Sequence, residues 1–241
     1  HRCCVKGIKY FCPMQQKTNS KSRIEFVALM AALMSVTALS IDALLPALDV
    51  IGFAIGTKTA ADNQLLVTMI FVGLGIGPLI FGPLSDATGR KLSVYLGLVV
   101  FVIASFVCVS AESLELMIFG RILQGIGLSA PRTICIAIIR DLYHGDYMAR
   151  IMSFVTVVFL LIPIVAPAMG KLVLSIFDWQ AIFYVQVVIS ILIGVWFWLR
   201  QEETLAVQNK IPFTFKRILS VVKETTQYKA TIGYTLISGF V

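Results

Sequence analysis

Long apolar runs alternate with short polar segments along most of this chain. A membrane-spanning helix needs about 20 apolar residues, and six runs meet that length, at 24–46, 64–83, 91–110, 115–139, 151–176 and 181–199. Another apolar run begins near residue 230 and continues to Val241. None of the runs has the long apolar–polar alternation that a membrane β-barrel requires. The pattern therefore predicts an all-α membrane protein that crosses the bilayer repeatedly.

The same pattern divides the chain into four parts. We expect a leader at 1–23, a six-span bundle at 24–200, a linker at 201–229 and the start of a seventh span at 230–241. Apolar residues recur in the linker at the spacing of an interfacial helix: Phe215, Ile218, Leu219 and Val222. The alternative is an amphipathic linker that serves only as a tether.

We expect two further properties of the leader. It has no cleavable signal pattern, because the apolar run behind it is already of span length. Met14 would begin a more ordinary leader than His1, so we expect residues 1–13 not to be native.

Composition and charge agree with a membrane protein and give its orientation. Hydrophobic residues make up 58% and charged residues 14%, with a mean hydropathy of +0.89, whereas a soluble domain is about a quarter charged. Of the 20 lysines and arginines, sixteen lie in the leader, the linker and alternate loops, while the other loops hold only Lys58 and Lys171. The positive-inside rule then predicts a cytoplasmic N-terminus. The net charge of +7 is accounted for by loops that face anionic lipid, and it does not indicate a nucleic-acid partner.

A carboxylate interrupts the first apolar run. Asp42 lies four residues before Pro46, and an acid inside a membrane helix usually faces the bundle interior or a water-filled cavity. One interpretation is an aspartate that reaches interfacial water. The other is a site that binds a proton or a cation, since burial raises a carboxyl pKa towards neutral pH.

The fourth run contains charged and polar residues on one helical stripe. Arg121 cannot lose its charge, so it needs a partner or water; Gln124 and Arg132 follow it at 3 and 11 residues, on the same stripe. Arg121 should lie about 9–12 Å from the outer end of the helix, and Arg132 about 16 Å deeper. We expect Arg121 to pair with Asp42 across a cavity, and a helix-tethering salt bridge without a transport role is the alternative. Arg132 could face an acid in a second half of the protein or an anionic group on a substrate.

Two further motifs contain proline, glycine and charge. The fifth run has a stripe of proline and small residues that bends a helix and allows close packing; it comprises Pro163, Ala166, Pro167 and Gly170. The segment between the second and third runs is a charged turn bounded by glycine; its marked residues are Gly82, Asp86, Gly89, Arg90 and Lys91.

These motifs together resemble the major facilitator superfamily. The charged turn is similar to the family loop G-x-L-x-D-R-x-G-R-K, with Ala87 in place of the first arginine. Arg121 to Gly127 are similar to the R-x-x-Q-G-x-G pattern of proton-coupled members, and the fifth run resembles the antiporter motif. The agreement is best with the bicyclomycin-resistance (Bcr/CflA) branch of multidrug:proton antiporters. The resemblance implies that the chain is the N-terminal half of a twelve-span fold. It also implies a cytoplasmic charge cluster of Asp86, Arg90 and Arg140 that stabilises the inward-closed state.

The expected function is proton-coupled efflux of drug-like small molecules by alternating access across the cytoplasmic (inner) membrane. The resemblance implies that the proton gradient drives transport without a cofactor, and that the partners are substrate, protons, lipid and a second six-span half, in a monomer. A metabolite exporter or importer on the same fold is the alternative, and a non-transporting sensor is a more remote one.

Enzyme and metal chemistry are not expected. No cluster of histidine and cysteine lies within the apolar runs, so an intramembrane enzyme is disfavoured. His1, Cys3, Cys4 and Cys12 have poor spacing for structural zinc, and we expect Cys108 and Cys135 to be small packing residues.

Overall fold

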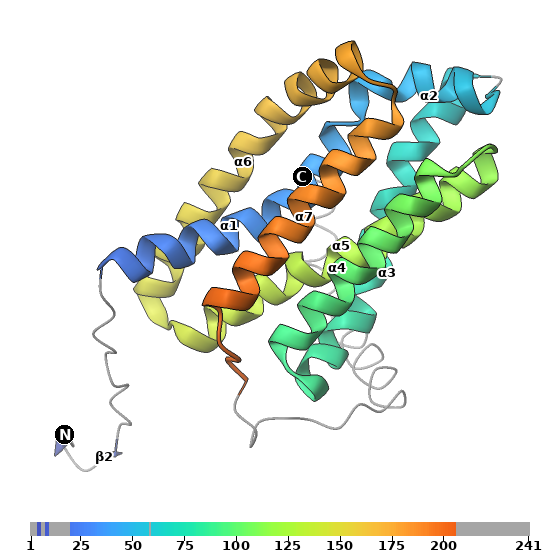
Figure 1. Ribbon diagram of the computed structural model, residues 1–241. Coiled ribbons are helices and arrows are strands. Elements are labelled where there is room, and N and C mark those ends of the chain that lie inside the picture. Colours follow the sequence, from blue (N-terminus) through green and yellow to red (C-terminus); the bar gives the residue numbers. More distant parts are fainter. Residues whose placement is uncertain (1–3, 6–7, 10–19, 58, 206–241) are drawn as a thin grey trace.

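The computed structural model describes residues 4–5, 8–9, 20–57 and 59–205. Two short strands, β1 (Cys4–Val5) and β2 (Ile8–Lys9), pair antiparallel. The remaining structure is helical (Figure 1), with elements α1 (Ser20–Asp42), a 3-10 turn η1 (Leu45–Ala47), α2 (Leu48–Ile55), α3 (Ala60–Thr88), α4 (Arg90–Val109), α5 (Leu114–Leu142), α6 (Gly145–Ile176) and α7 (Gln180–Arg200). The predicted linker helix and seventh span lie outside the described residues, and so does most of the leader.

Six helical segments have the length and apolar composition to cross a membrane. They are Ile24–Ile55, Ala60–Thr88, Arg90–Val109, Leu114–Leu142, Gly145–Ile176 and Gln180–Arg200. This confirms the predicted all-α, six-span bundle. Several segments extend beyond the predicted boundaries, because polar residues continue the helices at both ends of the apolar runs.

The first span differs most from the sequence-based expectation. It was predicted to end at 46, but helical structure resumes in α2 and continues to Ile55. A proline has no N–H and its ring collides with the carbonyl four residues earlier, and the residue four before Pro46 is Asp42, where α1 ends. The turn η1 carries the chain past this break, and Gly56, in the left-handed conformation (φ 72°), ends α2.

The bundle is held together where α5 crosses α3 and α4 at glycines. A Cβ at Gly73 would collide with the backbone of α5 at Ile122, and a Cβ at Gly125 would collide with the carbonyl of Ile70 on α3. Gly127 approaches Gly97 of α4 in the same way, with its would-be Cβ 2.7 Å from the Gly97 carbonyl oxygen. In a membrane the hydrophobic effect does not drive helices together, and small residues allow their backbones to approach and pack closely. α5 is therefore the central helix of the α3–α4–α5 group.

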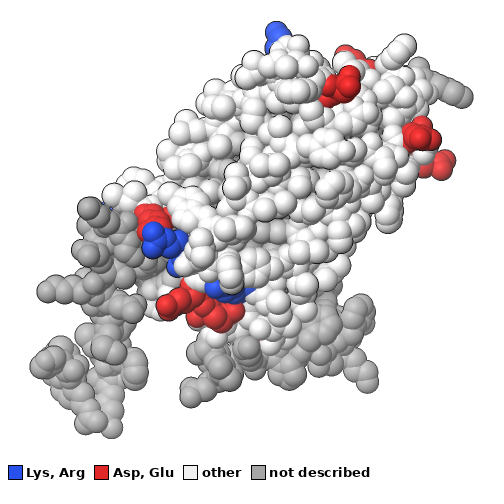
Figure 2. Space-filling model, in the orientation of Figure 1, with Lys and Arg blue, Asp and Glu red and all other residues white. Residues whose placement is uncertain are grey.

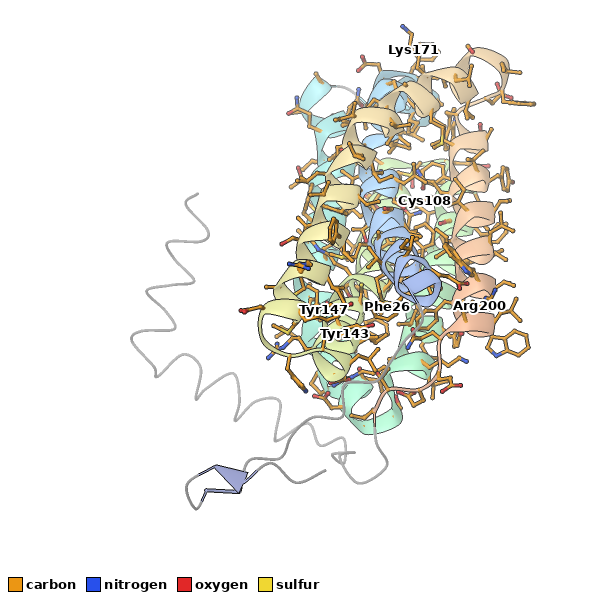
Figure 3. The ribbon with its side chains drawn as sticks, turned by 90° about the vertical axis from the view of Figure 1, so that its left-hand side faces the viewer. Phe26, Cys108, Tyr143, Tyr147, Lys171 and Arg200 are labelled. Carbon is orange, nitrogen blue, oxygen red and sulfur yellow. The ribbon has the colours of Figure 1, made fainter. Side chains whose placement is uncertain are left out.

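Charge gathers at the two ends of the bundle and leaves an uncharged belt between them (Figure 2). The end that contains the α3–α4 and α5–α6 connections carries Arg90, Lys91, Arg140, Arg150 and Arg200; we call it the basic end. Lys171 lies at the opposite end, far from Arg200 (Figure 3). The distribution agrees with the orientation that the positive-inside rule predicts, in which the basic end is cytoplasmic.

Two glycines two residues apart on α3 give a matched test of the α3–α5 crossing. Gly73→Leu should destabilise the bundle by at least about 1–3 kcal/mol, because the added side chain meets backbone that cannot move aside. Gly75→Leu should be tolerated, since nothing lies within 4 Å of a Cβ there. Thermal unfolding followed by size-exclusion chromatography in detergent measures both. Equal stability of the two variants would contradict the proposed crossing.

Candidate functional site

Arg121 lies at the centre of the bundle and is fully buried, with 0% of its surface exposed. Its guanidinium donates from Nε to the Leu66 carbonyl of α3 (3.2 Å) and from Nη1 to the Ser40 carbonyl of α1 (3.4 Å). Its carbon Cζ lies 5.6 Å from the ring centre of Phe183 on α7, at a distance where a cation is attracted to an aromatic face. One permanent charge thus contacts three other helices.

Gln124 connects Arg121 to α4. Its Oε1 accepts a hydrogen bond from Arg121 Nη1 (2.8 Å), and its Nε2 donates to Ser105 Oγ (2.8 Å). The Ser105 hydroxyl donates in turn to the Phe101 carbonyl, also at 2.8 Å. Gln124 was predicted from the stripe that it shares with Arg121, but Ser105 was not. A single serine in an apolar run is a weak signal, because it can bond to its own helix.

Asp42 and Arg121 do not form the ion pair that the sequence suggested. No carboxylate lies within 4 Å of Arg121 among the described residues, and its bond to α1 goes to the Ser40 carbonyl, two residues before Asp42. Asp42 is partly exposed at the end of α1. The two residues are therefore neighbours through the α1 backbone and are not joined by their charges in this conformation.

The small-residue stripe of α6 packs against the break in the first span. Ala166 and Gly170 are buried, whereas Pro163 is exposed and Pro167 is partly exposed. A Cβ at Gly170 would collide with the Ala43 carbonyl oxygen and lie 3.1 Å from Pro46 Cγ. The stripe therefore places the backbone of α6 directly beside the residues that follow Asp42.

Arg132 is exposed, unlike Arg121 on the same stripe of α5. It has no ion pair or hydrogen bond among the described residues. Counting back from Leu142, it lies about 15 Å inside the basic end of the helix. The structure thus brings Asp42, Arg121 and Gln124 to one level and places Arg132 nearer the basic end.

At the basic end, Arg90 joins two carboxylates. Its Nη1 donates to Asp86 Oδ1 (2.6 Å) and to Ser85 Oγ (2.7 Å), and its Nε donates to Asp141 Oδ2 (3.0 Å). Arg140, which was expected in this cluster, lines the adjacent cavity and has no ion pair among the described residues. The cluster therefore uses the acid that follows Arg140 in the sequence.

Glu203 supplies a third carboxylate, which contacts the start of α4. Its two oxygens accept the backbone N–H groups of Arg90 (2.9 Å) and Lys91 (3.1 Å). A helix begins with unpaired N–H groups and a partial positive charge, so a carboxylate stabilises it. Gly89, with φ 120°, leaves room for this carboxylate: a Cβ there would lie 2.6 Å from Glu203 Oε2. No sequence motif pointed to Glu203, because its partners are backbone groups.

Two cavities differ sharply in chemistry. One, of about 430 Å³, lies beside the Arg90 cluster; it is lined by Gly82, Ser85, Asp86, Arg90, Thr133, Ile134, Ala137, Arg140 and Asp141. The other, of about 550 Å³, is a groove between α4 and α7 whose lining includes no charged residue. Among the described residues no group of three histidine, cysteine or acidic side chains could hold a metal ion.

Comparison with known proteins identifies the class and then the family. Six helices of membrane-spanning length, with a buried arginine network and a charged turn at the basic end, define a polytopic membrane protein. The profile of the Major Facilitator Superfamily matches residues 28–240. The chain belongs to this superfamily.

The relatives include drug-resistance proteins. An uncharacterized MFS-type transporter YdgK of Bacillus subtilis is 30% identical over 230 residues, which are 95% of this chain and 57% of that protein. A bicyclomycin resistance protein homolog of Haemophilus influenzae is 28% identical over 220 residues, 91% of this chain and 55% of the relative. The multidrug resistance protein MdtL of Salmonella paratyphi A is 31% identical over 137 residues, 56% of this chain and 35% of MdtL.

A solved structure shares the fold. The crystal structure of the human organic anion transporter MFSD10 (TETRAN) superposes with a TM-score of 0.61 at 19% identity, covering 83% of this chain and 53% of that one. The chain thus spans about half the length of the relatives that it matches.

The Arg121 network can be tested through Gln124. Gln124→Leu should destabilise the bundle by about 1.5–3 kcal/mol, because a buried charge loses a hydrogen-bond acceptor and Ser105 loses a donor. Gln64→Leu, at an exposed position of α3, is the matched control and should change stability by less than about 0.5 kcal/mol. Denaturation in mixed micelles measures both. If Gln124→Leu were as stable as the control, the network would contribute nothing to the fold.

Proposed function

We propose that this chain is the N-terminal half of a proton-coupled exporter of drug-like small molecules, located in the cytoplasmic membrane. Two six-span halves would rock about a site near the midplane, so that it faces each side in turn. The basic end would face the cytoplasm.

The observation that carries the proposal is the position of Asp42. A carboxylate inside a membrane span marks a functional site by default, and Asp42 is partly exposed at the point where Pro46 ends α1. The C-terminal end of a helix already has a partial negative charge, which opposes an ionised carboxylate there. A group that has access to water but gains from binding a proton can carry that proton between two conformations.

The packing around Asp42 supports a conformational role. The segment after Asp42 touches Gly170 of the stripe on α6, while Ser40, just before it, accepts from Arg121. A change in the charge of Asp42 would therefore act on a helix break with α6 on one side and the arginine network on the other. Proton and substrate would each favour one of the two facing states.

The Arg90 cluster is proposed to stabilise one of these states. It joins the ends of α3 and α5 to the start of α4 at the basic end, beside the 430 Å³ cavity. Ala87 stands where the family has an arginine, so this cluster has one cation fewer than usual. We propose Arg140, on the cavity wall, as a residue that joins the cluster when the bundle closes at this end.

The names of the relatives favour drugs over metabolites as substrates. Two relatives, which match this chain over 220 and 137 residues, are named for bicyclomycin resistance and multidrug resistance. A dedicated metabolite exporter or importer on the same fold remains the alternative, because fold alone does not determine substrate.

The experiment uses the full-length protein in inverted vesicles with an acidified interior. Adding a transported drug should release protons from the vesicles, and Asp42→Asn should reduce this substrate-dependent release by at least about tenfold, since the amide cannot carry a proton. Asp178→Asn, in the exposed α6–α7 connection at the opposite end, is the control and should transport normally.

Three outcomes are informative. Proton release lost only in Asp42→Asn supports coupling at that residue. Unchanged release in Asp42→Asn shows that the proton binds elsewhere. No release with any cationic, neutral or anionic drug, from folded protein, contradicts a multidrug exporter and favours the metabolite carrier.

A further inference from the structure

Arg132 lies on α5 between the side that meets α1 and the side that meets α3. Leu128, four residues before it, accepts at its carbonyl from Thr37 of α1 (3.5 Å). Ser129, three residues before it, meets Gly77 of α3, where an added Cβ would collide with its side chain. Side chains three and four residues apart share a helical face, so Arg132 points into the space between α1 and α3.

The exposure of side chains on this stripe of α5 changes along the helix. Arg121, eleven residues earlier on the same stripe, bonds to carbonyls of both α1 and α3 and is fully buried. The two helices diverge towards the basic end (Figure 1), and there Arg132 is exposed. The stripe therefore runs from a buried position at Arg121 to an exposed position at Arg132, which lies nearer the basic end.

An arginine in this position can bind an anion. It keeps its charge at any physiological pH and presents five N–H donors in a planar fork that matches carboxylate, sulfonate or phosphate groups. A charged side chain at membrane depth faces a cavity or a partner, and no acid contacts Arg132 among the described residues. This face of α5 thus presents a cation without a counter-ion among the described residues.

We propose that Arg132 is an anion-binding residue on this exposed face of α5, and that the substrates include amphiphilic organic anions whose charged group contacts this guanidinium. This inference rests on the proposed transport function and narrows its substrate class. The apolar surroundings of α5 would hold the hydrophobic part of such a molecule, and the arginine would orient its charged end towards the basic end of the bundle.

The experiment compares two probes that differ only in charge. Anilinonaphthalene sulfonate is an anion, and phenylnaphthylamine has the same ring system without the sulfonate; the fluorescence of each reports its binding to the purified protein, with empty micelles subtracted. Arg132→Gln should weaken binding of the anion about tenfold, as expected for the loss of one charge-assisted contact. Arg132→Lys should recover part of that loss, and binding of the neutral probe should not change.

Arg150→Gln is the matched control. Arg150 is also an exposed arginine near the basic end, on α6, and its replacement should leave binding of both probes unchanged. An equal fall for the two arginine variants would show that the anion responds only to net charge and would overturn the proposal.

Two further outcomes would also overturn it. If both probes were lost together in Arg132→Gln, the residue would serve packing alone. If anion binding were unchanged while the full-length protein unfolded at a lower temperature, Arg132 would pair with an acid of the second half. The assay needs no proton gradient, so intact anion binding beside a failed Asp42→Asn test would contradict only the proton-coupling proposal.

Discussion

A permanent charge in the middle of an apolar bundle constrains everything around it. Arg121 cannot be neutralised, and an unpaired charge in a medium of low dielectric is costly. Most of this demand is met by backbone carbonyls of two helices, an amide side chain and an aromatic face, which belong to α1, α3, α5 and α7. Nη2 of Arg121 has no hydrogen-bond partner among the described residues. These helices cannot separate at this level without exposing the charge.

The break in the first span also requires that buried polar groups find hydrogen-bond partners inside the protein. Backbone groups in a membrane must find partners inside the protein, so a helix can end at Asp42 only where other structure covers the gap. The turn η1 supplies short-range bonds, including Ala47 N–H to the Leu44 carbonyl (2.9 Å), and Gly170 lets the backbone of α6 pack against this segment. A proline, an aspartate and a glycine on two helices therefore make one structural unit, although 124 positions separate Pro46 from Gly170.

Much of the fold could be predicted from sequence because its signals are local. Run length and composition give the six spans, and Gln124 could be placed beside Arg121 from helical spacing alone. The charge pair of Asp42 and Arg121 could not be judged in this way, because shared depth does not determine which way two side chains point. The role of Asp141 in the Arg90 cluster was not predicted. Arg140 and Asp141 are adjacent at the end of the fourth span, and the sequence alone does not show which of the two joins the cluster. The continuation of the first span into α2 was missed because Pro46 is as good a signal for an end as for a break.

The contact that Glu203 makes with the backbone determines which substitutions would preserve it. Its carboxylate binds main-chain N–H groups of Arg90 and Lys91, and every residue except proline supplies that donor. Substitutions on α4 would leave this contact intact, whereas any change at 203 that removes the acid would abolish it. The segment after the sixth span is thus joined to the start of the third span by an interaction that depends on an acid at 203 and a glycine at 89, and that places no demand on the side chains of Arg90 and Lys91.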